Sequence, residues 1–139
     1  KTEELTDRFT RLAAEYDNFK KRSAKEKDAI YLDASANTIE AVLPVLDNLE
    51  RAMAAATDME DNPLKQGVDM VLRQFKECFQ KLGVEEIQAA GEVFDPNFHH
   101  AVASAADEEK ESGTILEVLQ KGYKLKDKVI RYSMVKVCE

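Results

Sequence analysis

The two histidines of the chain are adjacent, and with a nearby carboxylate they are the first residues to consider for catalysis. Asp95, His99 and His100 lie within the short segment 94–100, and such side chains serve acid–base and metal chemistry. However, adjacent residues of a strand point to opposite faces of the sheet, so the two imidazoles cannot readily share one metal ion. We interpret the segment as a turn stabilised by Asp95 and Pro96, with a small metal-dependent enzyme as the alternative.

Other sequence signatures of enzymes are missing. The chain contains no GxSxG, P-loop, HExxH or GxGxxG motif. Its two cysteines, Cys78 and Cys138, have no CxxC partner and form neither a disulfide framework nor a zinc motif. We therefore expect no catalytic residue, no cofactor and no metal.

The charge of the chain limits its partners. Its 139 residues include 20 Lys and Arg and 27 Asp and Glu, a net charge of −7, which argues against a protein that coats nucleic acid or an anionic membrane. No apolar run is long enough to span a membrane and no leader sequence opens the chain, which predicts a cytoplasmic protein. Because the chain begins at Lys1, we expect a preceding N-terminal segment to be absent from it.

The first 43 residues contain neither Pro nor Gly and predict one long helix. Apolar residues follow one another at alternating steps of four and three, which is typical of a coiled-coil seam that needs a partner helix. When the same spacing is continued beyond residue 19, it falls mostly on polar residues, so the seam is expected to pair weakly there. The apolar seam residues are Leu5, Phe9, Leu12, Tyr16, Phe19 and Ile30, and the polar ones are Ser23, Glu26, Asp33 and Asn37.

Residues 44–83 predict two short amphipathic helices. Pro44 favours a break after the long helix, Asn62 and Pro63 predict the start of the last helix, and Gly83 predicts its end. Two short helices make half of a four-helix bundle, and a second copy of the chain would supply the other half. The residues expected in this contact are Leu46, Leu49, Met53, Val68, Leu72, Phe75 and Phe79.

Beyond Gly83 the apolar residues follow a period of two, which indicates strands. A strand over 129–137 is the clearest, a second runs from Leu116 to Tyr123, and residues 124–128 form a loop. The fold class is therefore α+β, with a helical region followed by a small all-β domain. Residues 114–139 carry 6 basic and 3 acidic residues, so this region is a docking face for an acidic partner or simply a solvated charged surface.

Four segments of the chain, in order, resemble the GrpE family, the nucleotide exchange factors of the bacterial chaperone DnaK. They are EYDNFKKR at 15–22, LPVLDNLERA at 43–52, FDPNFHHAV at 94–102, and GYKLKDKVIR at 122–131 with MVKV at 134–137. The last two match the family signature. The sequence departs from the family pattern at His100, at Lys128 and at Tyr132-Ser133.

The resemblance implies a homodimer with a paired long helix over 1–43, a four-helix bundle over 44–83 and a β domain over 84–139. It implies that the β domain docks on the nucleotide-binding domain of DnaK and holds its cleft open, so that ADP leaves without a covalent step. The long helix would also reach the substrate-binding region of DnaK. The docking residues that it implies are Asp95, Pro96, His99, Lys126, Asp127, Val129, Arg131, Met134 and Val135.

In related proteins the paired helices unwind at heat-shock temperature and slow exchange, and the polar seam of this chain agrees with such a thermosensor. A structural coiled-coil scaffold is the other alternative, although it leaves the β domain unexplained.

Overall fold

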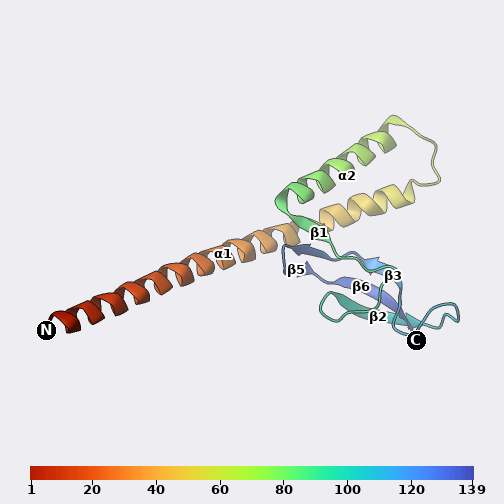
Figure 1. Ribbon diagram of the computed structural model, residues 1–139. Coiled ribbons are helices and arrows are strands. Elements are labelled where there is room, and N and C mark those ends of the chain that lie inside the picture. The colour runs from red at the N-terminus through yellow and green to blue at the C-terminus, as the bar shows by residue number, and fades with distance from the viewer. The chain divides into compact units, whose positions relative to one another are not determined.

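The computed structural model describes residues 1–139 and contains two helices followed by six strands (Figure 1). It divides into two compact units, Lys1–Ser35 and Ala36–Glu139. Neither helix has a stretch that is both long and apolar enough to cross a membrane. The elements are α1 (Thr2–Ala55), α2 (Pro63–Leu82), β1 (Val84–Glu86), β2 (His99–Ala105), β3 (Ile115–Gln120), β4 (Tyr123–Leu125), β5 (Lys128–Arg131) and β6 (Ser133–Cys138).

Helix α1 continues through Pro44, so the predicted break is wrong and the first of the two short helices is the end of α1. A proline inside a helix removes one backbone hydrogen bond and costs about 3 kcal/mol. Leu43 and Leu46, on either side of it, are completely buried. Because burying a leucine contributes about 1.5–3 kcal/mol, these two side chains offset the cost of the proline.

Helix α2 begins and ends where the sequence predicts. The Asn62 side chain accepts a hydrogen bond from the Lys65 N–H, Pro63 is the first helical residue, and Gly83 ends the helix in the left-handed conformation at φ 84°. These capping interactions satisfy backbone groups that the helix ends leave unpaired. The cap residues therefore account for both ends of α2.

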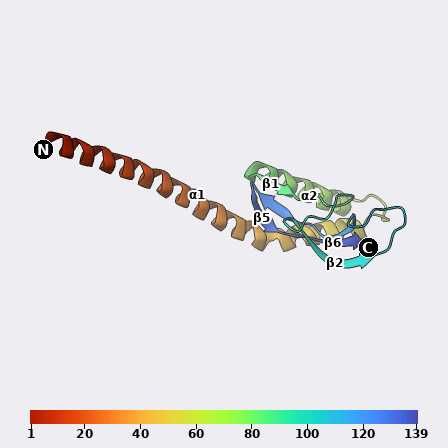
Figure 2. The ribbon, with the colours of Figure 1, turned by 60° about the horizontal axis from the view of Figure 1, so that its bottom comes forward.

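The strands form two three-stranded sheets, ordered β1-β4-β5 and β2-β6-β3. Strand β2 runs parallel to β6, and both views of the ribbon show them side by side (Figures 1 and 2). Strand β3 pairs with β6 in the antiparallel sense. The chain crosses between the sheets twice in its last part, from β3 to β4 and from β5 to β6.

Both predicted long strands are therefore divided. The strand expected over 129–137 becomes β5 and β6, which separate at Tyr132 and belong to different sheets. The strand expected from Leu116 to Tyr123 becomes β3 and β4, the alternation after Gly83 yields only the short β1, and the expected loop at 124–128 shrinks to Lys126 and Asp127. An alternating pattern indicates strand conformation but does not specify where a strand leaves one sheet for another.

The two crossings between the sheets meet at Gly122. A Cβ atom built on this residue would lie 2.6 Å from Ser133 Oγ and 2.7 Å from the carbonyl oxygen of Arg131, and it would also collide with the Ser133 nitrogen. Ser133 Oγ accepts a hydrogen bond from the Gly122 N–H at 3.1 Å. Glycine is therefore required here by the close approach of two backbone segments.

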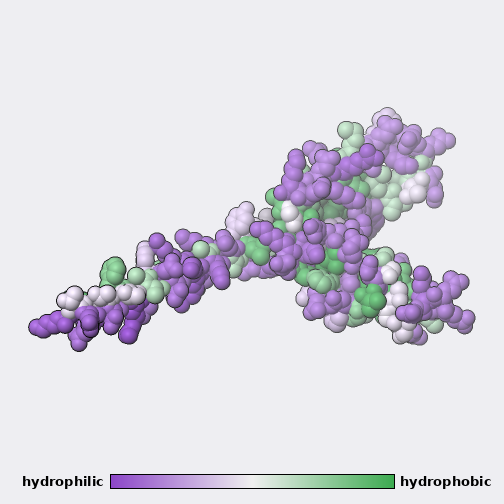
Figure 3. Space-filling model, viewed as in Figure 1, coloured by the Kyte–Doolittle hydropathy of each residue, from purple (hydrophilic) through white to green (hydrophobic).

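Apolar side chains gather in two places within Ala36–Glu139. Ala89, Ile115 and Val135 form one buried cluster at the β2-β6-β3 sheet. In the other, the ring of Phe79 on α2 packs edge to face against Tyr123 on β4, with centroids 5.8 Å apart. Figure 3 shows hydrophobic surface where the end of α1, α2 and the strands approach one another.

The predicted seam residues differ in exposure. Leu5, Phe9 and Phe19 remain exposed, as do the other apolar seam positions up to Ile30. Leu46, Leu72 and Phe79, which we expected between two chains, are buried by residues of the same chain. A contact of these three residues with a second chain stays a prediction. Leu49, Met53, Val68 and Phe75 are half-buried.

Candidate functional site

Two of the segments that resemble the GrpE family lie side by side in the β domain. The parallel pairing of β2 with β6 places His99 opposite Ser133, His100 opposite Met134 and Ala101 opposite Val135. Residues more than 30 positions apart in sequence thus share one sheet. The predicted docking residues Lys126 and Asp127 lie instead in the turn between β4 and β5, and Val129 and Arg131 lie on β5 of the other sheet.

Asp95 organises the turn before β2. Its carboxylate accepts a hydrogen bond from the Asn97 N–H at 2.9 Å, and its carbonyl oxygen accepts from the N–H groups of Phe98 and His99. An aspartate that bonds a backbone N–H two residues on is a standard turn device. The predicted turn at Asp95 is therefore confirmed, and it leaves Pro96 exposed.

His99 has a structural role in this turn. Only 3% of its surface is exposed. Its Nδ1 accepts a hydrogen bond from the Asp95 N–H at 3.0 Å, and its Nε2 lies 2.8 Å from the carbonyl oxygen of Gln88. Because Nδ1 is the acceptor, the neutral ring carries its proton on Nε2 and donates it to Gln88.

Both nitrogens of His99 are thus occupied by backbone groups. The ring of His99 is enclosed, and its hydrogen bonds hold the turn against residue 88, while its contact with a partner stays a prediction. The occupied nitrogens also weaken the metal-enzyme alternative, because a metal ligand needs a free ring nitrogen.

His100 points away from the core. Its ring stacks on Tyr132 with centroids 5.4 Å apart and an angle of 16° between the planes, and both residues are exposed. Met134, the register partner of His100, is also exposed. His100 and Tyr132 are two of the positions at which the chain departs from the family pattern, and they contact each other on the surface beside a predicted docking residue.

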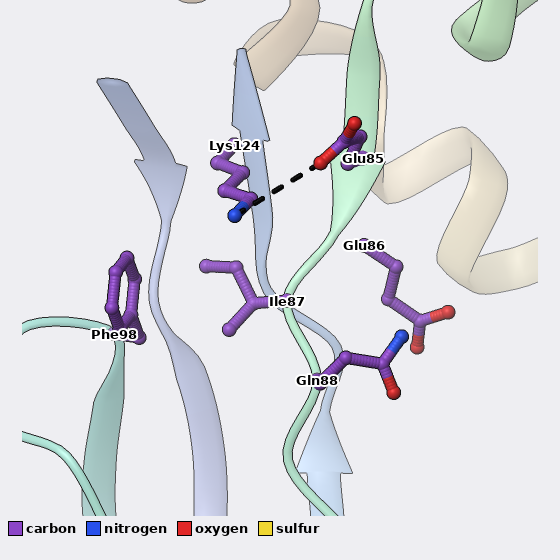
Figure 4. A pocket seen from close by; sticks show the side chains of 6 residues that line it. All are labelled: Glu85, Glu86, Ile87, Gln88, Phe98 and Lys124. Atoms are coloured by element: carbon purple, nitrogen blue, oxygen red, sulfur yellow. Dashed lines mark ion pairs between the residues drawn. The ribbon is translucent and has the colours of Figure 1, made fainter. Parts of the chain in front are cut away.

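A pocket of about 480 Å³ is lined by residues of β1 and the segment after it, of β4 and of the turn before β2: Glu85, Glu86, Ile87, Gln88, Phe98 and Lys124 (Figure 4). The Nζ atom of Lys124 lies 5.6 Å from the ring centroid of Phe98 and 3.9 Å from a carboxylate oxygen of Glu85. Ile87 lies between Lys124 and Phe98 in the view of Figure 4. The cation–π contact joins β4 to the turn that precedes β2.

The remaining predicted docking residues divide by exposure. Lys126 and Asp127 are exposed, and Lys126 has a left-handed φ of 54°. Val135 is completely buried in the single chain and lies in the core of the β2-β6-β3 sheet, and its contact with a partner stays a prediction. We define the docking surface as the exposed members, Pro96, Lys126, Asp127 and Met134.

Arg131 is held within the chain. Its two Nη atoms lie 2.7 and 2.9 Å from the two carboxylate oxygens of Asp47 on α1, and its Nε donates to the carbonyl oxygen of Lys121 at 3.0 Å. Asp47, Glu50 and Lys121 take part in this network although no sequence motif marks them. A signal was available, because Asp47 and Glu50 are acidic residues within the apolar run that begins at Val42.

The carboxylates of this region also affect Tyr123. Burial raises the pKa of its phenol well above the ordinary value, and the nearby carboxylates of Glu50, Glu86 and Asp47 raise it further, while Arg131 opposes them. Tyr123 is therefore a neutral apolar contact for Phe79 at physiological pH.

Comparison with known proteins assigns the chain to a family. The GrpE family model matches residues 1–139. Three similar relatives, each named "Protein GrpE", come from Clostridium beijerinckii, Clostridium acetobutylicum and Oceanobacillus iheyensis. They are 55%, 53% and 47% identical to the chain and cover 94%, 94% and 97% of it.

The chain covers 62%, 64% and 71% of the length of these three relatives, so it spans less than two thirds of the first two. The match extends over the helices, the turn at Asp95 and both sheets described above. The chain belongs to the GrpE family.

Proposed function

We propose that the chain is a nucleotide exchange factor for the DnaK chaperone. The observation that carries the proposal is the match of the GrpE family model to all of residues 1–139. The docking surface supports it, because it combines an exposed methionine and proline with a charged turn on a pair of small sheets. Such a surface acts by binding one conformation of its partner more tightly than another.

In this proposal the β domain binds the nucleotide-binding domain of DnaK in its open form. The preference for the open form is the free energy that is available to release ADP. Because no bond is made or broken, the chain needs no catalytic side chain, and it is a binding protein rather than an enzyme. The buried His99 and Val135 support the surface from below, and Met134 and Lys126 contact the partner.

The test measures release of a fluorescent ADP analogue from DnaK by stopped flow. We expect the chain at micromolar concentration to accelerate release, and we expect Met134→Ala with Lys126→Ala to lose most of the acceleration. The matched control is Met59→Ala with Lys110→Ala, a second exposed methionine and lysine outside the docking surface. Release at the uncatalysed rate in the presence of the unaltered chain would exclude the proposed function.

We further propose that the chain forms a homodimer through the exposed apolar seam of α1. Leu5, Phe9 and Phe19 expose much of their apolar surface in the single chain, and a seam with steps of four and three is covered by a second helix of the same kind. The scaffold alternative shares this dimer but predicts no effect on nucleotide release.

The polar part of the seam supports a thermosensor role for the paired helices. Replacing Ser23 and Glu26 with leucine is expected to raise the first helical melting transition by about 5 °C or more, because two apolar contacts per chain replace polar ones. The measurement is thermal melting followed by far-UV circular dichroism.

The control for this variant places the same residue type outside the seam. Ala24→Leu with Asp28→Leu adds leucine at exposed positions of the same turns, and it is expected to leave the transition nearly unchanged. Equal melting of the two double variants would show that the seam does not set the transition.

A further inference from the structure

Both crossings between the two sheets are held by carboxylates of α1. Asp47 pairs with Arg131, the last residue of β5 before the chain crosses to β6. Glu50 pairs with Lys121, which lies between β3 and β4, at 3.0 Å. Because Asp47 and Glu50 are three residues apart on a helix, they lie on the same face. We call Asp47, Glu50, Lys121 and Arg131 the crossing clamp.

The contacts of the clamp are directional as well as attractive. The planar guanidinium of Arg131 makes two parallel bonds to Asp47, and a bidentate pair specifies orientation as well as distance. The side chains are mostly enclosed, with exposures of 15% for Arg131 and 20% for Asp47. A pair shielded in this way is weakened less by salt than a surface pair.

Arg131 also links the two crossings to each other. Its Nε and one Nη donate to the carbonyl oxygen of Lys121, while the Lys121 ammonium pairs with Glu50. The Arg131 guanidinium also lies over the ring of Tyr123, with its Cζ atom 5.7 Å from the ring centroid. Lys76 of α2 adds a contact to Glu50 at 3.5 Å. The clamp therefore ties α1 to both sheet crossings, and Lys76 connects α2 to it.

The docking surface depends on these crossings for its shape. Lys126 and Asp127 follow β4 on one sheet, whereas Met134 lies on β6 of the other. Arg131 stands three residues before Met134 and at the end of the strand that follows the Lys126 turn. An error in the orientation of either crossing would move one part of the docking surface relative to the other.

We propose that Arg131, through Asp47, is a positioning residue for docking and does not itself contact the partner. It orients the two sheets relative to residues 36–55 of α1, so that both parts of the docking surface meet the partner together. The inference rests on the proposed function, and it gives Arg131, which the family resemblance places among the docking contacts, a supporting role instead.

The test compares Arg131→Lys, which keeps the charge and loses the bidentate fork, with Asp47→Asn, which keeps the shape and loses the charge. At a fixed, subsaturating concentration of the chain, we expect each substitution to slow the release of ADP from DnaK by about fivefold or more. We expect the double variant to be no slower than the slower of the two single variants. All variants are compared at a temperature at which circular dichroism shows them folded.

The matched control is Arg73→Lys, because Arg73 forms an exposed pair with Asp69 within α2 at 3.0 Å. Exposed pairs contribute little, so this variant is expected to release ADP at the unaltered rate. If Asp47→Asn also behaves as the unaltered chain while Arg131→Lys is slow, then Arg131 contacts the partner and the proposal is wrong. The proposal would also be wrong if the double variant slowed ADP release by the product of the two single fold-changes, because the two residues would then act independently.

A second readout needs no chaperone. Residual dipolar couplings of the full chain report the orientation of β4 and β6 amides relative to those of residues 36–55. In the unaltered chain and in Arg73→Lys, we expect a single alignment to fit the couplings of β4, of β6 and of residues 36–55. In Arg131→Lys and Asp47→Asn, we expect no single alignment to fit all three segments. Unchanged couplings in the latter two would overturn the positioning role. If the unaltered chain does not accelerate ADP release, the proposed function fails, and the couplings alone decide the role of Arg131.

Discussion

Replacing Gly122 with alanine is expected to lower the free energy of unfolding of the β domain by about 3 kcal/mol. The added methyl group would collide with the backbone nitrogen and the hydroxyl of Ser133 and with the Arg131 carbonyl oxygen. Backbone atoms of a second strand cannot swing aside as the end of a flexible side chain does. The substitution would therefore force the two sheet crossings apart, and the Gly122 hydrogen bond to Ser133 would be lost.

Hydrogen–deuterium exchange of the β4 and β6 amides in mild urea measures this loss. Gly67→Ala is the matched control, because Gly67 lies within α2 and has no atom within 4 Å of the position its Cβ would take. Alanine is the better helix former, so this control is expected to stabilise the chain by about 0.5–1 kcal/mol. Wild-type protection of β6 in Gly122→Ala would show that the crossings are not in close contact.

Replacing His99 with alanine is expected to cost about 3 kcal/mol, the second large effect. The substitution leaves the Asp95 N–H and the Gln88 carbonyl oxygen without their partners in a buried site. Each unsatisfied buried group costs about 1–3 kcal/mol. The neighbouring substitution His100→Ala removes only an exposed stack on Tyr132, and it is expected to cost less than about 1 kcal/mol.

Urea denaturation monitored by the β-domain amide resonances compares the two variants. His99 and His100 are adjacent and of the same residue type, so the two variants differ only in whether the side chain that is removed lies on the buried or the exposed face of β2. Similar midpoints for both would contradict the buried hydrogen bonds of His99. Zinc added to the unaltered chain is expected to leave its midpoint unchanged, whereas a zinc-dependent rise that His99→Ala abolishes would restore the metal-site alternative.

The local features of the chain were predictable from the sequence. Asn62, Pro63 and Gly83 were recognised as the caps of α2 because capping depends on backbone geometry within a few residues. Asp95 was recognised as a turn residue for the same reason. The regular steps of four and three from Leu5 to Phe19 indicated a helix with one apolar seam, and this stripe is exposed in the single chain.

The errors concern contacts between distant residues. Pro44 was expected to end the helix, but the helix continues through it, and Leu43 and Leu46 on either side are completely buried in the folded chain. The alternation over 129–137 was correct as strand conformation, yet the change of sheet at Tyr132 depends on the approach of Gly122 to Ser133. Local patterns contain no information about such approaches.

The candidate site also combines features that the sequence predicts with features that only the folded chain shows. The residue types of the docking surface and the family resemblance were present in the sequence, and the family comparison confirmed the family. The sequence did not separate exposed Met134 from buried Val135, or distinguish surface Lys126 from Arg131 paired with Asp47. That distinction requires the register of β2 with β6 and the placement of α1 against the sheet crossings.

The sequence by itself determined the helical first half, the caps, the turn at Asp95 and the family, because each depends on residues near one another or on a pattern along the chain. The tertiary structure decided which of two adjacent histidines is buried, where the strands change sheets and that Arg131 pairs with Asp47 across 84 positions. Burial and pairing at such separations depend on the whole packed arrangement, in which every partner must be in place before any one side chain is enclosed.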